Sequence, residues 1–552
     1  MTTTTVPEAV ATRVGGRLRD RCTLAALAIG AAGLVYRVAM LAFAVPPTNS
    51  DEATIGLAAL HIATGRDFPV FFYGQHYMGA LEAYLAAPLT LLFGQHTVVL
   101  RIPLLLMYAG FLVCGYRLAR RLYPPGLALV TVALLALGSD RVLKDQMLAA
   151  GGYPEITFFG ALLMLLAVRL ASGGTTRRGV TFAAWGLVAG LCLWVDWLVL
   201  PYVAASAWLI VARCRSDLRR RYGGGALLAG LLLGAAPVLG YNLGAAPGHD
   251  SISVFLRLNG GDGDPSLGAR LYGGVLFGVP MGTGLCSPSR CAPWQLWWGV
   301  GYPVLLVAAL VLAIRAVRVG GTRGEAAPGD GAVPDVRRLA HLALLVAAAV
   351  TLLAYARSAA AGQTPVESAR YLACLLISTP AVLWPLWSVA TRPGTGARRR
   401  LAAAAPVAGL LATAVLASVA LVAATPGYAR RARDQDVLVG ALRQRGLTRI
   451  YSEYWTCNRI AYATREQVVC AVLGDDLRPG YDRYAPYRSL VAHAPRPAYV
   501  LPAGGPLDRR FAQVLADSGV PATVTDVAGY RIYQPDQPVP VPLPPRPARA
   551  DG

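Results

Sequence analysis

Residues 23–53 read TLAALAIGAAGLVYRVAMLAFAVPPTNSDEA, an apolar stretch followed by two adjacent carboxylates, Asp51 and Glu52. About 20 apolar residues are what an α-helix needs to cross the hydrocarbon core of a bilayer. Arg37 lies near the far end of this stretch. Its side chain is expected to reach the membrane interface or, as the alternative, to face a functional site. The acidic pair is therefore predicted to lie just beyond the first membrane span.

The composition is that of an integral membrane protein. Hydrophobic residues make up 55% and charged residues 15% of the 552 residues. The formal net charge of +21 is of a size seen in nucleic-acid-binding proteins. Its distribution argues against that class, because the arginines gather in short gaps between alternate apolar runs, as they do on the cytoplasmic side of membrane proteins. No nucleic-acid partner is expected.

The arginine-rich gaps predict a mainly α-helical, polytopic bundle. Residues 1–22 are expected to be a cytoplasmic segment, and residues 23–427 a transmembrane module that ends on the outer side. An apolar segment at residues 79–93 is too short to cross, so we expect an interfacial or re-entrant helix there. About eleven spans are predicted, at residues 23–45, 97–116, 123–138, 155–169, 180–195, 197–212, 224–243, 296–314, 339–356, 371–389 and 401–424.

Residues 428–533 change character and are predicted to form a small extracytoplasmic α/β domain, because short strand-like runs alternate with helical patterns. A proline-rich tail, residues 534–552, follows. Within the domain, Tyr451, Tyr454 and Trp455 are either a surface that stacks on sugars or ordinary core aromatics. The expected strands are Thr448–Tyr451, Gln467–Val472, Ala498–Leu501 and Thr523–Ile532, with helices at Asp434–Arg445 and Leu507–Ser518.

Four cysteines agree with this topology. Cys286 and Cys291 fall in a long outer loop, and Cys457 and Cys470 fall in the terminal domain. That side of a membrane tolerates disulfides, so two bridges are predicted, Cys286 with Cys291 and Cys457 with Cys470. A zinc site is not favoured, because no second cysteine pair or histidine cluster lies at ligand spacing.

Candidate chemistry gathers on the predicted outer side. Asp51 or Glu52 is a candidate general base, or the pair is a solvated acidic loop. Arg370 offers phosphate a fork of donors, or else forms an ion pair with Glu367 three residues earlier. Glu155 follows Pro154 at a helix start, where the helix dipole also favours a carboxylate. No phosphate-binding loop, dinucleotide fingerprint or nucleophilic serine elbow is present.

Several motifs occur in a fixed order, and together they resemble the polytopic C-type glycosyltransferases, especially the bacterial protein-mannosyltransferase-like and lipid A aminoarabinose-transferase-like members. The resemblance covers roughly residues 25–390. The motifs are Asp51-Glu52, Tyr73-Gly74-Gln75, Tyr77-Met78-Gly79 with Glu82, Arg101-Ile102-Pro103, Arg120-Arg121-Leu122-Tyr123 and Glu367-Ser368-Ala369-Arg370-Tyr371-Leu372.

The resemblance implies roles for these residues. Asp51 would be the catalytic base, Glu52 would support it or orient the acceptor, and Glu155 would line the same cavity. Glu155 stands where an aspartate is usual in the family. Some members need a divalent metal, for which Asp51, Glu52 and Glu155 are the candidate ligands. Substrate-binding roles are implied for Arg370 and Tyr371, which would hold the lipid phosphate, and for Gln75, His76, Tyr77 and Glu82.

The expected function is therefore that of an inverting glycosyltransferase of the bacterial plasma membrane, with a cytoplasmic amino terminus and an extracytoplasmic carboxyl terminus. Its donor would be a polyprenyl-phosphate sugar, hexosyl or pentosyl, and its acceptor a hydroxyl on an envelope glycan, glycolipid or protein. One alternative is a flippase for lipid-linked sugars, which predicts charges deep inside spans and duplicated, interrupted helices. Another is a non-catalytic partner in envelope assembly.

Overall fold

The computed structural model describes residues 8–259, 265–288, 291–322 and 332–542. The chain forms two compact units. The helical unit contains the residues up to Met40, Leu104–Met147 and Gly152–Ala423. The α/β unit contains Leu41–Pro103, Leu148–Gly151 and the residues from Ala424 onward. Residues 46–96, which the sequence predicts to be an outer loop and which we call the first outer segment, therefore belong to the same unit as the carboxyl-terminal domain.

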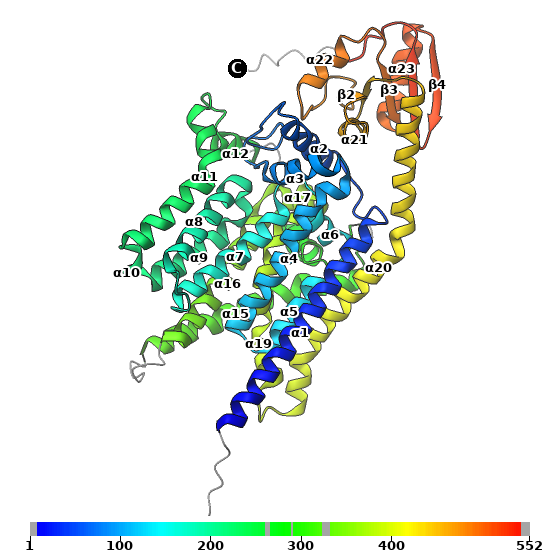
Figure 1. Ribbon diagram of the computed structural model, residues 1–552. Coiled ribbons are helices and arrows are strands. Elements are labelled where there is room, and N and C mark those ends of the chain that lie inside the picture. The colour runs from blue at the N-terminus through cyan, green and yellow to red at the C-terminus, as the bar shows by residue number, and fades with distance from the viewer. Residues whose placement is uncertain (1–7, 260–264, 289–290, 323–331, 543–552) are drawn as a thin grey trace, which may run out of the picture. The chain divides into compact units, whose positions relative to one another are not determined.

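Long apolar helices make up the helical unit (Figure 1). Short helices connect them, and α4 and α20 contribute residues to both units. The elements are α1 (Glu8–Leu41), α4 (Thr97–Leu122), α5 (Pro125–Ala136), α6 (Asp140–Met147), α7 (Tyr153–Ala171), α8 (Arg178–Val195), η1 (Trp197–Val199), α9 (Leu200–Arg213), α10 (Arg215–Leu218), η2 (Arg221–Gly225), α11 (Ala226–Gly244), α12 (Ser251–Asn259), α13 (Leu267–Leu271), η3 (Tyr272–Phe277), α14 (Gly278–Gly282), η4 (Pro293–Leu296), α15 (Trp297–Thr322), α16 (Ala332–Arg357), α17 (Ala359–Gln363), α18 (Pro365–Ser368), η5 (Ala369–Ser378), α19 (Thr379–Thr391) and α20 (Ala397–Gln444).

The helices confirm a multi-pass membrane protein. Within the described residues, nine helices are long and apolar enough to cross a bilayer. The third predicted span is instead a bent pair, α5 and α6, which turn by 87° at a short break. The sixth is a shorter apolar helix, Trp197–Arg213. The break has a physical cause, because α6 reads DRVLKDQM and is too polar to continue α5 through hydrocarbon.

Arg37 stabilises the end of α5, and the expectation that it reaches the interface is wrong. Its side chain is fully buried. It donates hydrogen bonds to the carbonyl of Ala136 at 2.8 Å and to Oε1 of Gln146 at 3.0 Å. Its guanidinium lies 3.8 Å from the centre of the Tyr108 ring. Because α5 stops at Ala136, its last carbonyls lack helical partners, and the arginine supplies them with donors.

Glycines bring α8 and α11 into backbone contact. These helices lie side by side in Figure 1. A Cβ atom added to Gly190 of α8 would lie 2.3 Å from the carbonyl oxygen of Leu231, and one added to Gly234 of α11 would lie 2.2 Å from that of Leu187. Small residues spaced four apart allow this approach, which drives helix association in lipid through close packing.

We therefore predict that Gly190→Ala lowers the melting temperature of the purified protein. The added methyl group forces the two helices apart, which should reduce the free energy of unfolding by about 1–3 kcal/mol. Thermal unfolding in detergent measures it. Gly240→Ala on α11 is the matched control, because beyond the neighbouring backbone of its own helix nothing lies within 4 Å of the Cβ position there. Equal melting temperatures for the two variants would contradict this packing.

The terminal domain has the predicted mixture of strands and helices. Its five strands run in the order β2-β1-β3-β5-β4. β2, β1 and β3 pair in parallel, β5 pairs antiparallel with β3, and β4 pairs antiparallel with β5. Leu438 and Leu442 at the end of α20 contribute to its core. The elements are β1 (Arg449–Ser452), α21 (Tyr454–Ala463), β2 (Val469–Val472), α22 (Pro486–Ala492), β3 (Ala498–Pro502), α23 (Pro506–Ser518), β4 (Ala522–Val527) and β5 (Tyr530–Pro535).

The expectation of a single strand over Thr523–Ile532 is wrong. The segment folds back as the hairpin of β4 and β5, with a two-residue turn at Ala528 and Gly529. Both turn residues have positive φ, 48° and 82°, as hairpin turns that match strand twist require. The end of the predicted tail, residues 543–552, lies outside the described residues, as do residues 1–7 of the predicted cytoplasmic segment.

Two helices from the first outer segment complete the α/β unit. They are α2 (Ser50–Ala63) and α3 (Leu81–Phe93), the latter covering the segment predicted to be too short to cross. α2 packs on both α3 and α21. At Gly56 an added Cβ atom would lie 2.3 Å from a ring carbon of Tyr462, so the absence of a side chain lets α2 lie flat on α21.

Candidate functional site

The acidic pair forms the first turn of α2. Asn49 caps this helix by accepting a hydrogen bond from the backbone N–H of Glu52 at 2.9 Å. Asp51 and Glu52 therefore lie at the positive end of the helix dipole, which favours carboxylates. Asp51 is 8% exposed, and Glu52 is fully buried.

Two side chains from the terminal domain hold one oxygen of Asp51. The hydroxyl of Tyr454 donates to Oδ1 at 2.5 Å, and Nη2 of Arg483 donates to the same oxygen at 3.2 Å. Nε of Arg483 also donates to the Tyr454 hydroxyl at 2.7 Å. The three groups therefore form a closed triangle, which we call the Asp51 triad. Within the described residues, both hydrogen bonds from the triad to Asp51 are made to Oδ1, and neither is made to Oδ2.

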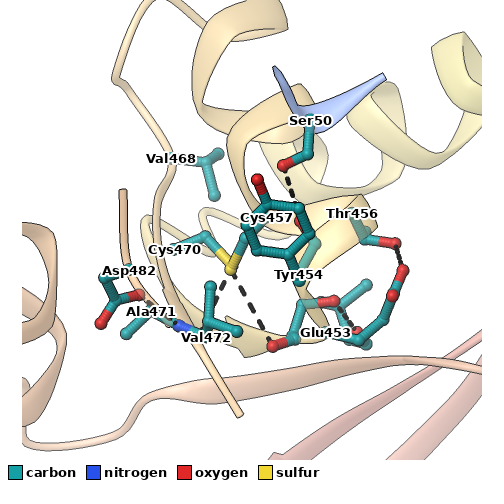
Figure 2. The surroundings of a disulfide bond; sticks show 12 residues. Ser50, Glu453, Tyr454, Thr456, Cys457, Val468, Cys470, Ala471, Val472 and Asp482 are labelled. Atoms are coloured by element: carbon teal, nitrogen blue, oxygen red, sulfur yellow. Dashed lines mark hydrogen bonds between the residues drawn. A yellow bond between two sulfur atoms is a disulfide. The ribbon is translucent and has the colours of Figure 1, made fainter. Parts of the chain in front are cut away.

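Local structure fixes Tyr454. It begins α21, and its carbonyl accepts a hydrogen bond from the hydroxyl of Ser50 at 2.6 Å. The disulfide between Cys457 and Cys470 joins α21 to β2 beside this contact, as Figure 2 shows. Burial, together with the negative charge of Asp51, raises the pKa of Tyr454 above its ordinary value. The phenol therefore keeps its proton and remains a donor to Asp51.

Arg483 was not among the residues predicted from the sequence. It lies between β2 and α22, and its guanidinium is 4.3 Å from the centre of the Phe72 ring. Burial acts to lower its pKa, but the neighbouring Tyr454 and Asp51 outweigh burial and raise the pKa above the ordinary value. Arg483 is thus a permanent cation beside Asp51.

Glu52 pairs with a different arginine. Nε and Nη2 of Arg101 donate to its two carboxylate oxygens, each at 2.6 Å. Both side chains are buried, so removal of either partner would leave an uncompensated charge at a cost of about 3–5 kcal/mol. This geometry favours a positioning role for Glu52, since its pairing fixes the turn that carries Asp51.

A second network joins the far end of α2 to the terminal domain. His61 contacts the Tyr73 hydroxyl at 2.7 Å through Nδ1 and Oε1 of Glu466 at 2.9 Å through Nε2. Glu466 also pairs with Arg66 and accepts from the Tyr487 hydroxyl at 2.8 Å. Burial acts to raise the pKa of Glu466, but the hydrogen bonds from His61, Arg66 and Tyr487 outweigh it and lower the pKa to about 2.

The other residues of the first outer segment lie in the same unit as Asp51. Gln75, His76 and Tyr77 are partly exposed in the turn between α2 and α3. Glu82 is buried and accepts a hydrogen bond from the backbone N–H of Gly151 at 3.2 Å. Substrate-binding roles for these four residues stay predictions.

The aromatic residues of the terminal domain separate into core and surface. Tyr451 is 3% exposed and stacks on Tyr499, so the sugar-stacking expectation is wrong for Tyr451. Trp455 is 52% exposed and lies next to Tyr454 on α21. Trp455 therefore remains the candidate for contact with a sugar.

Glu155 and Arg370 lie in the helical unit. Glu155 is fully buried in the first turn of α7. The Arg370 guanidinium lies 5.0 Å from the centre of the Tyr153 ring and 5.8 Å from that of Tyr371. The side chain of Glu367 is exposed. That Glu155 and Asp51 line one cavity stays a prediction.

Buried charged groups surround the segment that carries Arg370. Arg141 forms an ion pair with Asp145 and donates to the carbonyls of Val366 and Glu367 at 3.3 and 3.2 Å. Burial raises the pKa of Asp196, at the end of α8, to about 7, against the opposing effects of the Leu198 N–H and the Arg370 charge. The segment is thus held by hydrogen bonds, and the charge of Arg370 acts on the Asp196 carboxyl.

The disulfide predicted in the outer loop also forms, between Cys286 and Cys291. As for metals, the described ranges contain no group of three or more histidine, cysteine or acidic side chains placed to hold an ion.

Comparisons with known proteins identify the fold. No protein-family model matches the chain, and no curated protein does. Among solved structures, ArnT from Cupriavidus metallidurans in the apo state matches with a TM-score of 0.53 at 13% identity, over 89% of this chain and 93% of that one. The oligosaccharyltransferase AglB from Archaeoglobus fulgidus, in complex with an inhibitory peptide and a dolichol-phosphate, matches with a TM-score of 0.42 at 12% identity, over 92% and 74%. This second likeness supports no further conclusion. The first shows that this chain shares the fold of that protein, in agreement with the predicted helical, polytopic architecture.

Proposed function

We propose that the chain is an integral-membrane glycosyltransferase that moves one sugar from a polyprenyl-phosphate donor to a hydroxyl group of an extracytoplasmic acceptor. The observation that carries the proposal is the Asp51 triad, a nearly buried carboxylate with one oxygen fixed by two donors. Such an arrangement suits a general base, which must be held within hydrogen-bond reach of the proton it takes. The fold shared with ArnT supports the same class of reaction.

In the proposed reaction, Asp51 accepts the proton of the acceptor hydroxyl through Oδ2. The acceptor oxygen then attacks the anomeric carbon from the face opposite the phosphate. The bond between that carbon and the phosphate oxygen breaks, polyprenyl phosphate leaves with the electron pair, and the anomeric configuration inverts. The carboxylate therefore gains one proton in each turnover and must release it before the next.

A separate proposal concerns Arg370, from the helical unit alone. We propose that its guanidinium binds the phosphate of the lipid donor, because arginine presents a planar fork of donors that matches phosphate oxygens. Support comes from its partly exposed position over Tyr153 and from the fixed segment that carries it. Tyr371 would contribute to the same contact.

The proposed location is the bacterial plasma membrane, with the amino terminus cytoplasmic and the carboxyl terminus extracytoplasmic. The disulfides Cys286–Cys291 and Cys457–Cys470 support this orientation, because such bonds persist on the oxidising side of a membrane. The acceptor is then an envelope glycan, glycolipid or protein. A divalent metal is not required by the proposed chemistry.

Replacement of the base tests the function. Purified wild type, offered a panel of radiolabelled polyprenyl-phosphate sugars with envelope extract as acceptor, is expected to transfer one of them. Asp51→Asn keeps the shape of the side chain and removes the base, so transfer should fall by about 10²–10⁴-fold while donor binding persists. Asp517→Asn, at an exposed position of α23, is the matched control. Equal transfer by Asp51→Asn and wild type would exclude Asp51 as base. Donor that crosses vesicle membranes without any transfer would favour a flippase instead.

Arg370 is tested through donor affinity. Arg370→Gln removes the fork and the charge, so the KM for the lipid donor should rise about tenfold or more, since a charged hydrogen bond contributes about 1.5–3 kcal/mol. Arg370→Lys should recover part of the loss. The control is Arg392→Gln, an exposed arginine just after α19. An unchanged KM for donor in Arg370→Gln would contradict the phosphate-binding role.

A further inference from the structure

We propose that Arg483 is a positioning residue for Asp51 and that, with Tyr454, it makes the terminal domain part of the catalytic machinery. The proposal rests on the proposed function and deepens it. It assigns the domain a role in the chemical step, whereas a domain that only selects the acceptor would act on acceptor binding.

The triad geometry carries the argument. Tyr454 and Arg483 both donate to Oδ1 of Asp51, at 2.5 and 3.2 Å. Two donors on one oxygen fix the plane of the carboxylate and leave the lone pairs of Oδ2 for an incoming hydroxyl. The guanidinium also places a positive charge beside the carboxylate of this nearly buried residue.

Arg483 is itself held before any substrate arrives. Its side chain is 11% exposed and lies against Phe72, while Nη1 donates to the carbonyl of Tyr73 at 3.5 Å. Neighbouring Asp482 accepts from the backbone N–H of Val472 at 2.8 Å, which fastens the loop to the end of β2. The guanidinium is therefore preorganised, which lowers the entropy lost when it orients the base.

Close packing of the same loop points to the same conclusion. An added Cβ atom at Gly480 would lie 2.6 Å from a methyl group of Val472, so the loop follows the sheet at a distance that only glycine permits. The N–H of Gly480 donates to the Val472 carbonyl at 2.8 Å. Tyr481 then donates to the carbonyl of Gly74, which joins the loop to the turn after α2.

Other charged groups near Asp51 have partners of their own. On α2 itself, Glu52 pairs with Arg101 of α4. On α3, Glu82 accepts from the N–H of Gly151. Other charged or titratable groups on the packed elements include Tyr73 in the turn after α2, Tyr84 of α3, Glu453, Tyr454, Arg459 and Tyr462 at the start of α21 and along it, Tyr481 and Asp482 in the loop, and His61 with Glu466 at the far end of α2. In the described part of the chain, the cation that pairs with Asp51 is Arg483.

The test is the pH dependence of sugar transfer by the full-length enzyme. In Arg483→Gln, kcat should fall about tenfold or more, because a charged hydrogen bond to the base is lost. The acidic limb of the kcat profile should move to higher pH by about one unit, because the cation no longer favours the ionised carboxylate. The KM for donor should stay unchanged. Arg483→Lys keeps the positive charge, so the acidic limb should stay at its wild-type pH and kcat should fall less than in Arg483→Gln. Tyr454→Phe should also lower kcat, although Arg483 is still present.

Arg496→Gln, an exposed arginine between α22 and β3, is the control and should match wild type. A raised KM for donor in Arg483→Gln, with the acidic limb of the kcat profile at its wild-type pH, would overturn the proposal. Arg483 would then bind substrate directly. A lowered melting temperature in both Arg483 variants, with kcat per folded molecule unchanged, would overturn it in favour of a structural role. If wild type transfers no sugar from any donor, the proposed function and this inference both fail. If wild type transfers sugar but the acidic limb of the kcat profile does not move in Arg483→Gln, only this inference fails.

Discussion

The ionic hydrogen bonds on Asp51 connect residues that are more than 400 positions apart in the chain, because Tyr454 and Arg483 reach it from the terminal domain. Together with the His61–Glu466 contact at the far end, they hold α2 along its whole length on that domain. The first outer segment and the carboxyl terminus consequently form one unit. The candidate base is oriented only once both parts of the chain have folded together.

The helical unit obeys a different constraint, the absence of water in the hydrocarbon core. Polar groups there need internal partners, and Arg37 meets that need where α5 breaks off. Apolar helices gain little from the hydrophobic effect in lipid, so α8 and α11 associate through glycines and direct backbone contact. Close backbone packing thus contributes to the helical unit, while the α/β unit combines a hydrophobic core with charged hydrogen bonds and the Cys457–Cys470 disulfide.

Sequence patterns predicted the features that repeat or are locally encoded. Apolar runs and arginine-rich gaps predicted nine helices that, within the described residues, are long enough to cross a bilayer, and cysteine positions predicted both disulfides. The hairpin of β4 and β5 was missed because its turn, Ala528-Gly529, lacks the asparagine or aspartate that usually marks such turns. Arg483 was missed for a different reason. In a chain with 51 basic residues, one arginine in a loop carries no local signal, and only the tertiary fold brings it to Asp51.

The central claim is that Asp51 is the base and that Arg483 acts through it, and a double-mutant cycle on the rate of sugar transfer at saturating donor tests this most directly. We expect Arg483→Gln to lower the rate about tenfold or more in the wild-type background. In the Asp51→Asn background it should change the residual rate by less than about twofold, because the group through which it acts is gone. The same tenfold loss in both backgrounds would contradict the account and would show that Arg483 contributes to transfer independently of Asp51.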